Sequence, residues 1–172
     1  MEAVALMTAM VAAAGPWFFP ALSGRNLAGQ DVTVPASYPG KHLLVCLGFT
    51  RASQYEVEPW AALATQAFGK DDRFLVLEMP MYSGAARLFR PFIDNGMARA
   101  TPQQLHVNVV TSTSVDEAME GLRLEDKEQA AIVLVGADGG VRFVARGAPN
   151  AQSREAFKQA LASLRAEQRA VK

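Results

Sequence analysis

Residues 42–60, HLLVCLGFTRASQYEVEPW, place a continuous apolar run directly before an amphipathic segment. An unbroken run such as 42–49, with β-branched content and no polar alternation, is typical of a central strand covered on both faces. From Glu56 to Phe68, apolar residues recur at spacings of three and four, and Gly69 provides a stop signal. A buried strand followed by a helix therefore predicts an α/β protein.

Upstream and downstream of this unit, the hydrophobic pattern keeps alternating between the two kinds of element. A turn-rich link, 15–30, leads into a short strand at 31–34, and RFLVLEMPM, 73–81, predicts a second buried strand. A helix is expected at 85–97, where Pro91 either starts a second turn or kinks the first. The stretch QLHVNVVTS predicts a strand or an extended link, and SVDEAMEGL a short helix capped by Ser114, with Glu117 at the capping-box position.

The closing third has the clearest pattern. Residues 130–147 form two strand-like runs around Asp138, Gly139 and Gly140, whose glycines supply the positive φ that a tight hairpin needs. A final helix capped by Ser153 follows, with an apolar face and a charged tail. The order of elements predicts a mixed central sheet with flanking helices on both faces, closed by a C-terminal β-hairpin and a helix.

Composition narrows the functional classes. The chain has 172 residues, half of them hydrophobic, which suits one domain with one core. Its 17 basic residues balance 17 acidic ones, so no overall field favours nucleic acid. A single cysteine forms no intramolecular disulfide, and two histidines are too few for a conventional zinc site.

The first residues need a separate interpretation. Residues 4–19, VALMTAMVAAAGPWFF, contain an apolar stretch of signal-peptide length with small residues suited to cleavage after Ala14. Only Met1, Glu2 and Ala3 precede it, without the Lys or Arg that normally leads a signal peptide. We therefore expect residues 1–18 to be either a signal peptide or an N-terminal helix, and residues 19–172 to be the main domain. Export to the periplasm or association with the envelope is predicted, with the cytoplasm as the alternative.

The order of elements resembles the thioredoxin-like fold in its peroxiredoxin and cytochrome-maturation branch. Three phrases are similar to that fold: FPALSGRNLAGQDVTV before the first hairpin, GKHLLVCLGFT before the active-site helix, and VLVGADGGVRFVARGAP at the closing hairpin. The resemblance covers roughly residues 19–165. It implies a three-layer α/β domain of the thioredoxin-like type.

The stretch GFTRASQYE resembles the motif of the copper chaperones of cytochrome oxidase assembly, the Sco-like branch. Ala52 and Glu56 occupy the positions at which that motif has its two cysteines. Neither residue supplies a thiolate for copper(I) or a sulfur for a disulfide. Ala130 and Ala131 stand at the closing strand where thioredoxin-like redox enzymes place a cis-proline. The resemblance therefore implies a redox scaffold without its redox groups.

A relative without these cysteines is the ATP10 family, whose members assist assembly of the membrane sector of mitochondrial ATP synthase. The similarity rests on FPALSGRNLAGQ, GKHLLVCLGF, Trp60 and GADGGVRFVARG. It implies a non-catalytic assembly factor or chaperone that binds a protein partner, a subunit of a membrane complex. From the composition and the short apolar stretch we expect no cofactor, metal, nucleic acid or transmembrane helix.

Two surfaces are candidate binding sites. The first is the start of the helix after the central strand, where ligands often bind in α/β sheets. An anion or carboxylate could bind there, or the loop could simply cap the helix. Its residues are Thr50, Arg51, Ser53, Gln54 and Tyr55. The second is 84–99, where Arg87 and Arg90 stand among apolar residues, either as a docking surface or as solvated charges on a packed helix.

Other residues support alternatives. Cys46 is the sole candidate nucleophile for a degenerate peroxiredoxin-like or thiol oxidoreductase enzyme, but its position within a strand predicts a buried thiol. Met79 and Met81 could serve copper delivery, or fill the core. His42 and His106 are expected to be ordinary strand or surface residues. The cluster 17–19 either anchors the leading segment on the sheet or contacts a membrane interface or partner. The other methionines considered for copper are Met7, Met10, Met97 and Met119.

Overall fold

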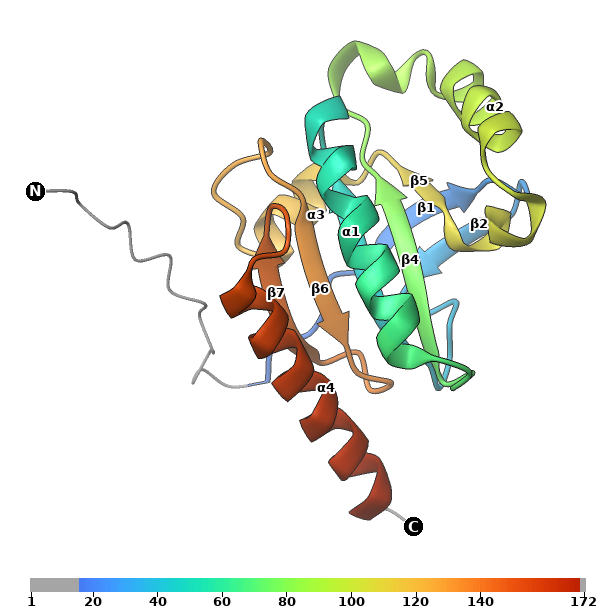
Figure 1. Cartoon of the computed structure of the whole chain (residues 1–172). Coiled ribbons are helices and arrows are strands. Elements are labelled where there is room, and N and C mark those ends of the chain that lie inside the picture. Colours follow the sequence, from blue (N-terminus) through green and yellow to red (C-terminus); the bar gives the residue numbers. More distant parts are fainter. Residues whose placement is uncertain (1–15, 171–172) are drawn as a thin grey trace, which may run out of the picture.

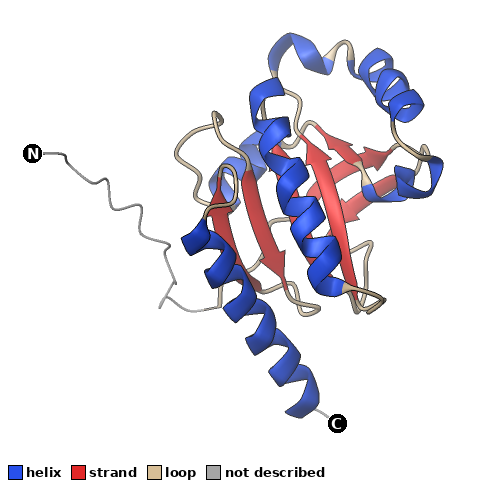
Figure 2. Ribbon diagram, viewed as in Figure 1, coloured by secondary structure: helices blue, strands red, loops and turns tan. Residues whose placement is uncertain are grey.

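A mixed β-sheet lies at the centre of the computed structural model, which describes residues 16–170 (Figures 1 and 2). Four strands pair in the order β4-β3-β6-β7 and three in the order β2-β1-β5. Parallel bridges from Glu78 to Val109 and from Met81 to Ser112 join β5 to the β4 edge. The strands are β1 (Leu22–Asn26), β2 (Asp31–Val34), β3 (His42–Gly48), β4 (Phe74–Pro80), β5 (Val110–Ser112), β6 (Ala131–Val135) and β7 (Val141–Arg146).

Helices cover both faces of this sheet. On one face lie α1 (Arg51–Phe68) and α4 (Ala151–Ala170), and on the other lies α3 (Val115–Gly121), seen behind the sheet in Figure 1. The remaining elements, η1 (Gly84–Arg87), α2 (Arg90–Ala100) and η2 (Gln103–Asn108), connect β4 to β5. In the described part of the chain, no helix combines the length and the apolar composition needed to cross a membrane.

The central strand β3 explains why residues 42–49 are apolar without interruption. It pairs with β4 in parallel and with β6 in antiparallel register, so that Cys46 lies between Glu78 and Ile132. Leu44 and Cys46 face α1 and α4, whereas Leu43, Val45 and Leu47 face α3. Every residue of β3 is buried, because both faces are covered.

The core beneath α1 and α4 is aromatic. Trp60, Phe143 and Phe157 pack with ring centroids 5.7–6.0 Å apart. The Trp60 indole is fully buried, and its Nε1 donates to the carbonyl oxygen of Gly147 at 2.9 Å. This bond satisfies the polar atom of the largest buried side chain and fixes α1 to the end of β7.

The leading segment packs into the second core, on the α3 side of the sheet. Phe19 is buried, Trp17 Nε1 donates to Gly121 at the end of α3, and the backbone N–H of Val141 donates to the Trp17 carbonyl. Phe18 is 55% exposed. Trp17 and Phe19 thus anchor this segment on the sheet and α3. Residues 1–15 of the predicted signal peptide, with its cleavage point at Ala14, lie outside the described residues.

The mixed sheet, its central strands, the closing hairpin and the flanking helices are confirmed, and three local expectations are corrected. The helix after β3 begins at Arg51, five residues before the periodic apolar face. Strand β1 lies inside the stretch expected to be a link. The region QLHVNVVTS divides into the 3₁₀ helix η2 and the short strand β5.

Of the two predicted helix caps, one is confirmed in position only and the other is wrong. Ser114 is the N-cap residue of α3, but its side chain makes no capping hydrogen bond and instead donates to the carbonyl of Ser23 at 3.4 Å. The cap of α4 is Asn150, whose Oδ1 accepts from the Ser153 backbone at 2.9 Å, so Ser153 lies within the first turn. At the hairpin, Gly139 alone of the two glycines has a positive φ, 80°.

The helix expected at 85–97 is broken in two. The first part is the 3₁₀ helix η1, and Pro91 lies in the first turn of α2, where its missing N–H costs nothing. None of the residues in η1 or α2 is fully buried. The apolar residues Leu88, Phe89 and Phe92 are exposed, whereas Ile93 is partly covered.

Candidate functional site

The first candidate surface is the start of α1, at the carboxyl end of β3. Thr50 is the N-cap, and its side chain accepts from the Ser53 backbone N–H at 3.1 Å. The buried Ser53 hydroxyl oxygen accepts in return from the backbone N–H groups of Phe49 and Thr50, both at 2.9 Å. This reciprocal capping box holds the loop 48–53 in one conformation.

The other candidate residues of this loop divide into structural and exposed groups. Gln54 Nε2 donates to the carbonyl of Gly48 at 3.1 Å, and a Cβ at Gly48 would lie 2.5 Å from that nitrogen. Gly48 is therefore required for Gln54 to close over the strand end. Arg51 is exposed and Tyr55 is 69% exposed. The structure brings Thr50, Ser53 and Gln54 together as scaffold and leaves Arg51 and Tyr55 facing outward. The binding role of this surface stays a prediction.

The two positions that would hold cysteines lie one turn apart on α1. Ala52 is exposed, and Glu56 is partly buried. Glu56 Oε2 accepts from the backbone N–H of Ala130, 74 residues later in the chain, at 2.7 Å. Ala130 immediately precedes β6, the place where a cis-proline was expected in a redox-active relative. The Glu56 carboxylate thus links the first turns of α1 directly to the residue before β6.

The hydrogen bonds continue from Ala130 into the protein interior. Its carbonyl oxygen accepts from the Gly147 N–H at 2.9 Å, and the Gly147 carbonyl accepts from Trp60. Glu56 and Trp60, both on α1, therefore hold the two sides of one backbone junction between β6 and β7. Because both backbone groups of Ala130 are already satisfied internally, they are not free to pair with an extended peptide.

Cys46 is fully buried within β3, as its position in the apolar run predicts. Burial raises the pKa of its thiol far above the ordinary value, and the nearby Glu78 carboxylate acts in the same direction. Since the thiolate is the reactive form, Cys46 is a packing residue in this conformation.

The methionine side chains proposed for copper are dispersed. Met79 is 1% and Met81 3% exposed, and both pack in the core that faces α3. Met97 Sδ accepts from the Tyr82 hydroxyl at 3.2 Å, and Met119 packs against the same core. Met7 and Met10 lie outside the described residues. Over 16–170, no three His, Cys, Asp or Glu side chains gather as metal ligands.

The two histidines are both partly or fully enclosed. His42 is 6% exposed, stacks on Phe74 and accepts at Nδ1 from the Ala137 N–H at 3.0 Å, while its Nε2 contacts Gln168. Burial, and then the Arg73 and Arg142 charges, lower its pKa. His106 Nε2 lies 3.0 Å from the Ala98 carbonyl and 2.9 Å from that of Thr101. Both rings are structural, and His42 is more buried than the sequence suggested.

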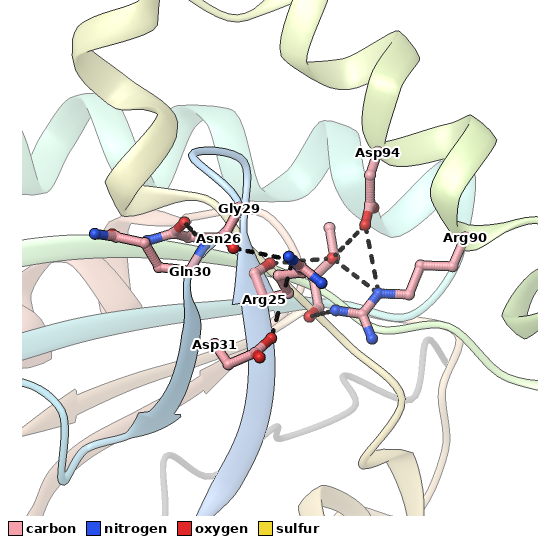
Figure 3. Close-up of polar contacts among 8 residues, drawn as sticks. Arg25, Asn26, Gly29, Gln30, Asp31, Arg90 and Asp94 are labelled. Carbon is pink, nitrogen blue, oxygen red and sulfur yellow. Dashed lines mark hydrogen bonds and ion pairs between the residues drawn. The ribbon is translucent and has the colours of Figure 1, made fainter.

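On the second candidate surface, Arg90 has a structural role (Figure 3). Its Nη2 donates to the Thr111 carbonyl at 2.8 Å, and its Nε lies 3.4 Å from Asp94 Oδ2. The Thr111 hydroxyl donates to the same Asp94 oxygen at 3.0 Å. This network fastens α2 to β5, so Arg90 is not a free docking charge. Arg87 is exposed in η1.

Sequence reasoning did not settle two features of these surfaces. The bond from Ala130 to Glu56 joins residues far apart in sequence, and its only sequence signal was an acidic residue in a cysteine position. The exposure of Leu88, Phe89 and Phe92 was left undecided between a docking surface and a packed helix, because helical spacing alone does not show which face a neighbour covers.

Solved structures match this arrangement over most of the chain. A thioredoxin domain of a thiol-disulfide oxidoreductase from Bacteroides vulgatus aligns with a TM-score of 0.58 and 18% identity, covering 86% of this chain and 98% of that one. BsSco, a member of the Sco family of cytochrome c oxidase assembly proteins, aligns with a TM-score of 0.60 and 14% identity, covering 87% and 94%. The fold is thioredoxin-like.

A further match is a thiol:disulfide interchange protein from Chlorobium tepidum, described as DsbE, with a TM-score of 0.58, 13% identity and coverage of 87% and 96%. The sequence matches no protein-family model and no curated protein. At these identities the likeness establishes the thioredoxin-like fold alone, since one fold serves many activities.

Proposed function

We propose that this protein is a non-catalytic thioredoxin-like protein that acts as an assembly factor or chaperone for a membrane protein complex, in the manner of the ATP10 family. We place it outside the cytoplasm or at the envelope. The sequence resemblance to ATP10 supports this role, and one structural neighbour is described as a member of a family of assembly proteins.

The observation that carries the proposal is the hydrogen bond from Ala130 to Glu56. Thiol-disulfide exchange requires a thiolate that attacks an accessible disulfide. At the position expected for that chemistry the chain has Ala52 and Glu56, and Glu56 is committed to a backbone N–H. The scaffold of the site is retained and rigid, but its reactive atoms are replaced by a structural bond.

A rigid surface without a nucleophile is suited to binding. The capped start of α1 presents Arg51 and Tyr55, two residue types that are enriched at protein interfaces. Because the capping box fixes the backbone beneath them, little conformational entropy is lost there when a partner binds. We infer that the client contacts this end of α1.

A crosslinked affinity pull-down from the native membrane fraction, read by mass spectrometry, tests this role. The wild type is expected to recover subunits of one membrane complex, and an Arg51→Glu/Tyr55→Ser variant to lose them. Arg154→Glu, an exposed arginine on α4, is the matched control and should recover the complex. Arg90 is unsuitable for this test because its replacement would detach α2.

Two outcomes would contradict the proposal. One is the absence of any recovered partner together with consumption of peroxide or a disulfide substrate that Cys46→Ser abolishes, which would favour the enzyme alternative. The other is copper(I) binding lost on Met79→Ala and Met81→Ala, which would favour metal delivery. Each alternative requires a sulfur atom that is buried in this structure to become accessible.

A further inference from the structure

The connection between β4 and β5 carries an unusual surface. Seven large hydrophobic side chains are exposed in the described part of the chain, and five of them lie between residues 84 and 108. Leu88 is 82%, Phe92 81% and Phe89 61% exposed. With Arg87 and Arg99 these three residues form what we call the η1–α2 ridge. The other four exposed hydrophobic side chains, which are not part of the ridge, are Leu105, Val107, Phe18 and Tyr55.

The orientation of this ridge is fixed by the opposite face of α2. Arg90 and Asp94, one turn apart and both labelled in Figure 3, are bound to Thr111 of β5. Further along, Met97 accepts the Tyr82 hydroxyl, and His106 binds the Ala98 carbonyl. Because the inner face is held by these contacts, the outer face cannot rotate inward to bury its apolar residues.

The charge of the segment is one-sided, although the whole chain is neutral. Residues 80–108 contain three arginines and a single acidic residue, Asp94. Asp94 is already paired with Arg90. Arg87 and Arg99 are exposed, and within residues 16–170 neither has a salt-bridge partner. The exposed apolar residues are therefore accompanied by uncompensated positive charge.

We propose that the η1–α2 ridge seats the protein on an anionic lipid bilayer. Leu88, Phe89 and Phe92 insert at the boundary between headgroups and acyl chains, and the arginines bind lipid phosphates. At 11 residues α2 is about 16 Å long, too short to span a bilayer but sufficient to lie in its interface. Exposed apolar side chains along a short helix, with nothing in the described chain covering them, fit a deformable surface such as a lipid interface.

This orientation deepens the proposed function and would serve it. Strands β3 and β4 are adjacent and parallel, so their carboxyl ends lie at the same end of the sheet, the upper end in Figure 1. Both α1, which follows β3, and the ridge, which follows β4, therefore begin at that end. A protein seated through the ridge would bring Arg51 and Tyr55 to the level of the membrane surface, where a membrane-embedded client is accessible.

Vesicle flotation with the full chain tests the ridge. Wild type should float with vesicles in which phosphatidylglycerol replaces part of the phosphatidylcholine, and much less with phosphatidylcholine alone. Leu88→Ser/Phe92→Ser should lower the partition coefficient by at least about tenfold, because two apolar side chains no longer insert. Phe18→Ser, another exposed aromatic residue on the β7 side of the sheet, is the matched control and should float as wild type.

The arginines are tested separately. Arg87→Gln/Arg99→Gln should weaken binding to the anionic vesicles by roughly fivefold for each charge removed, whereas Arg154→Gln should not. Thermal unfolding of every variant should match wild type, since all these side chains are exposed.

Several results would overturn the lipid proposal. The first is failure of the wild type to float, and the second is unchanged flotation of Leu88→Ser/Phe92→Ser. The third is a wild-type dimer in sedimentation that becomes a monomer in this variant, because the ridge would then be a contact between two copies of the chain. Client capture from detergent-solubilised membranes does not depend on the bilayer. If capture through Arg51 and Tyr55 persists while flotation fails, only the ridge is refuted; the reverse result refutes only the client surface.

Discussion

Replacing Glu56 by alanine should destabilise the fold through the backbone of a residue 74 positions away. Ala130 is fully buried, and its N–H has the Glu56 carboxylate as acceptor at 2.7 Å. A buried donor left without a partner costs about 1–3 kcal/mol. Because Glu56 is only partly buried and water can reach its place, we expect a loss near the middle of this range, about 2 kcal/mol.

Urea unfolding, followed by far-UV circular dichroism, measures this loss directly. Glu56→Ala should lower the midpoint at an unchanged m-value, and lower the Tm by about 4–8 °C for a domain of this size. Glu56→Gln keeps an acceptor oxygen but loses the charge, so about half of the loss is expected. Glu58→Ala, an exposed carboxylate on the same helix, should stay within about 0.5 kcal/mol of wild type.

The reasoning would be refuted if Glu56→Ala unfolded at the same urea concentration as Glu58→Ala. That result would mean that Ala130 finds another acceptor at no cost. The carboxylate would then be an incidental contact and not a bond that stabilises the junction between α1 and β6.

Three further predictions concern the side chains of Cys46, His42 and Arg90. Cys46 should react with a thiol reagent only at the rate of unfolding, because its thiol is buried and its pKa raised. His42 should make stability fall as the pH drops below its ordinary pKa of 6.5, since its folded pKa is lowered and the unfolded chain binds the proton more tightly. Full stability is therefore expected above pH 6.5, and His42→Gln should remove this dependence in urea midpoints measured between neutral and acid pH. Arg90→Ala should cost about 1–2 kcal/mol and raise amide exchange along α2, because Asp94 loses its cation, whereas Arg87→Ala should change neither.

Each of these has an outcome that contradicts it. Rapid labelling of Cys46 in the native protein would show that β3 opens easily. An unchanged pH profile in His42→Gln would assign the acid sensitivity to other groups. Equal exchange in the two arginine variants would mean that the contacts with Thr111 do not hold α2.

The sequence alone determined the elements whose evidence is local. The apolar run of 42–49 is typical of a strand covered on both faces, and β3 is such a strand. The closing hairpin and the apolar face of α4 were equally visible, because turn chemistry and helical spacing are properties of neighbouring residues. The start of α1 was located as a candidate surface, and Thr50 and Ser53 as its caps, for the same reason.

The tertiary structure alone decided how distant residues meet. In the folded chain, Glu56 is the acceptor for the Ala130 N–H, Arg90 donates to Thr111, and Leu88 and Phe92 are exposed. Spacing along α2 indicates that a helix has an apolar face, but not whether another element covers it. That depends on where the chain returns, and here β5 meets the polar side of α2. The hydrogen bond between Ala130 and Glu56, and the exposed η1–α2 ridge, are thus consequences of packing between segments that the sequence order separates.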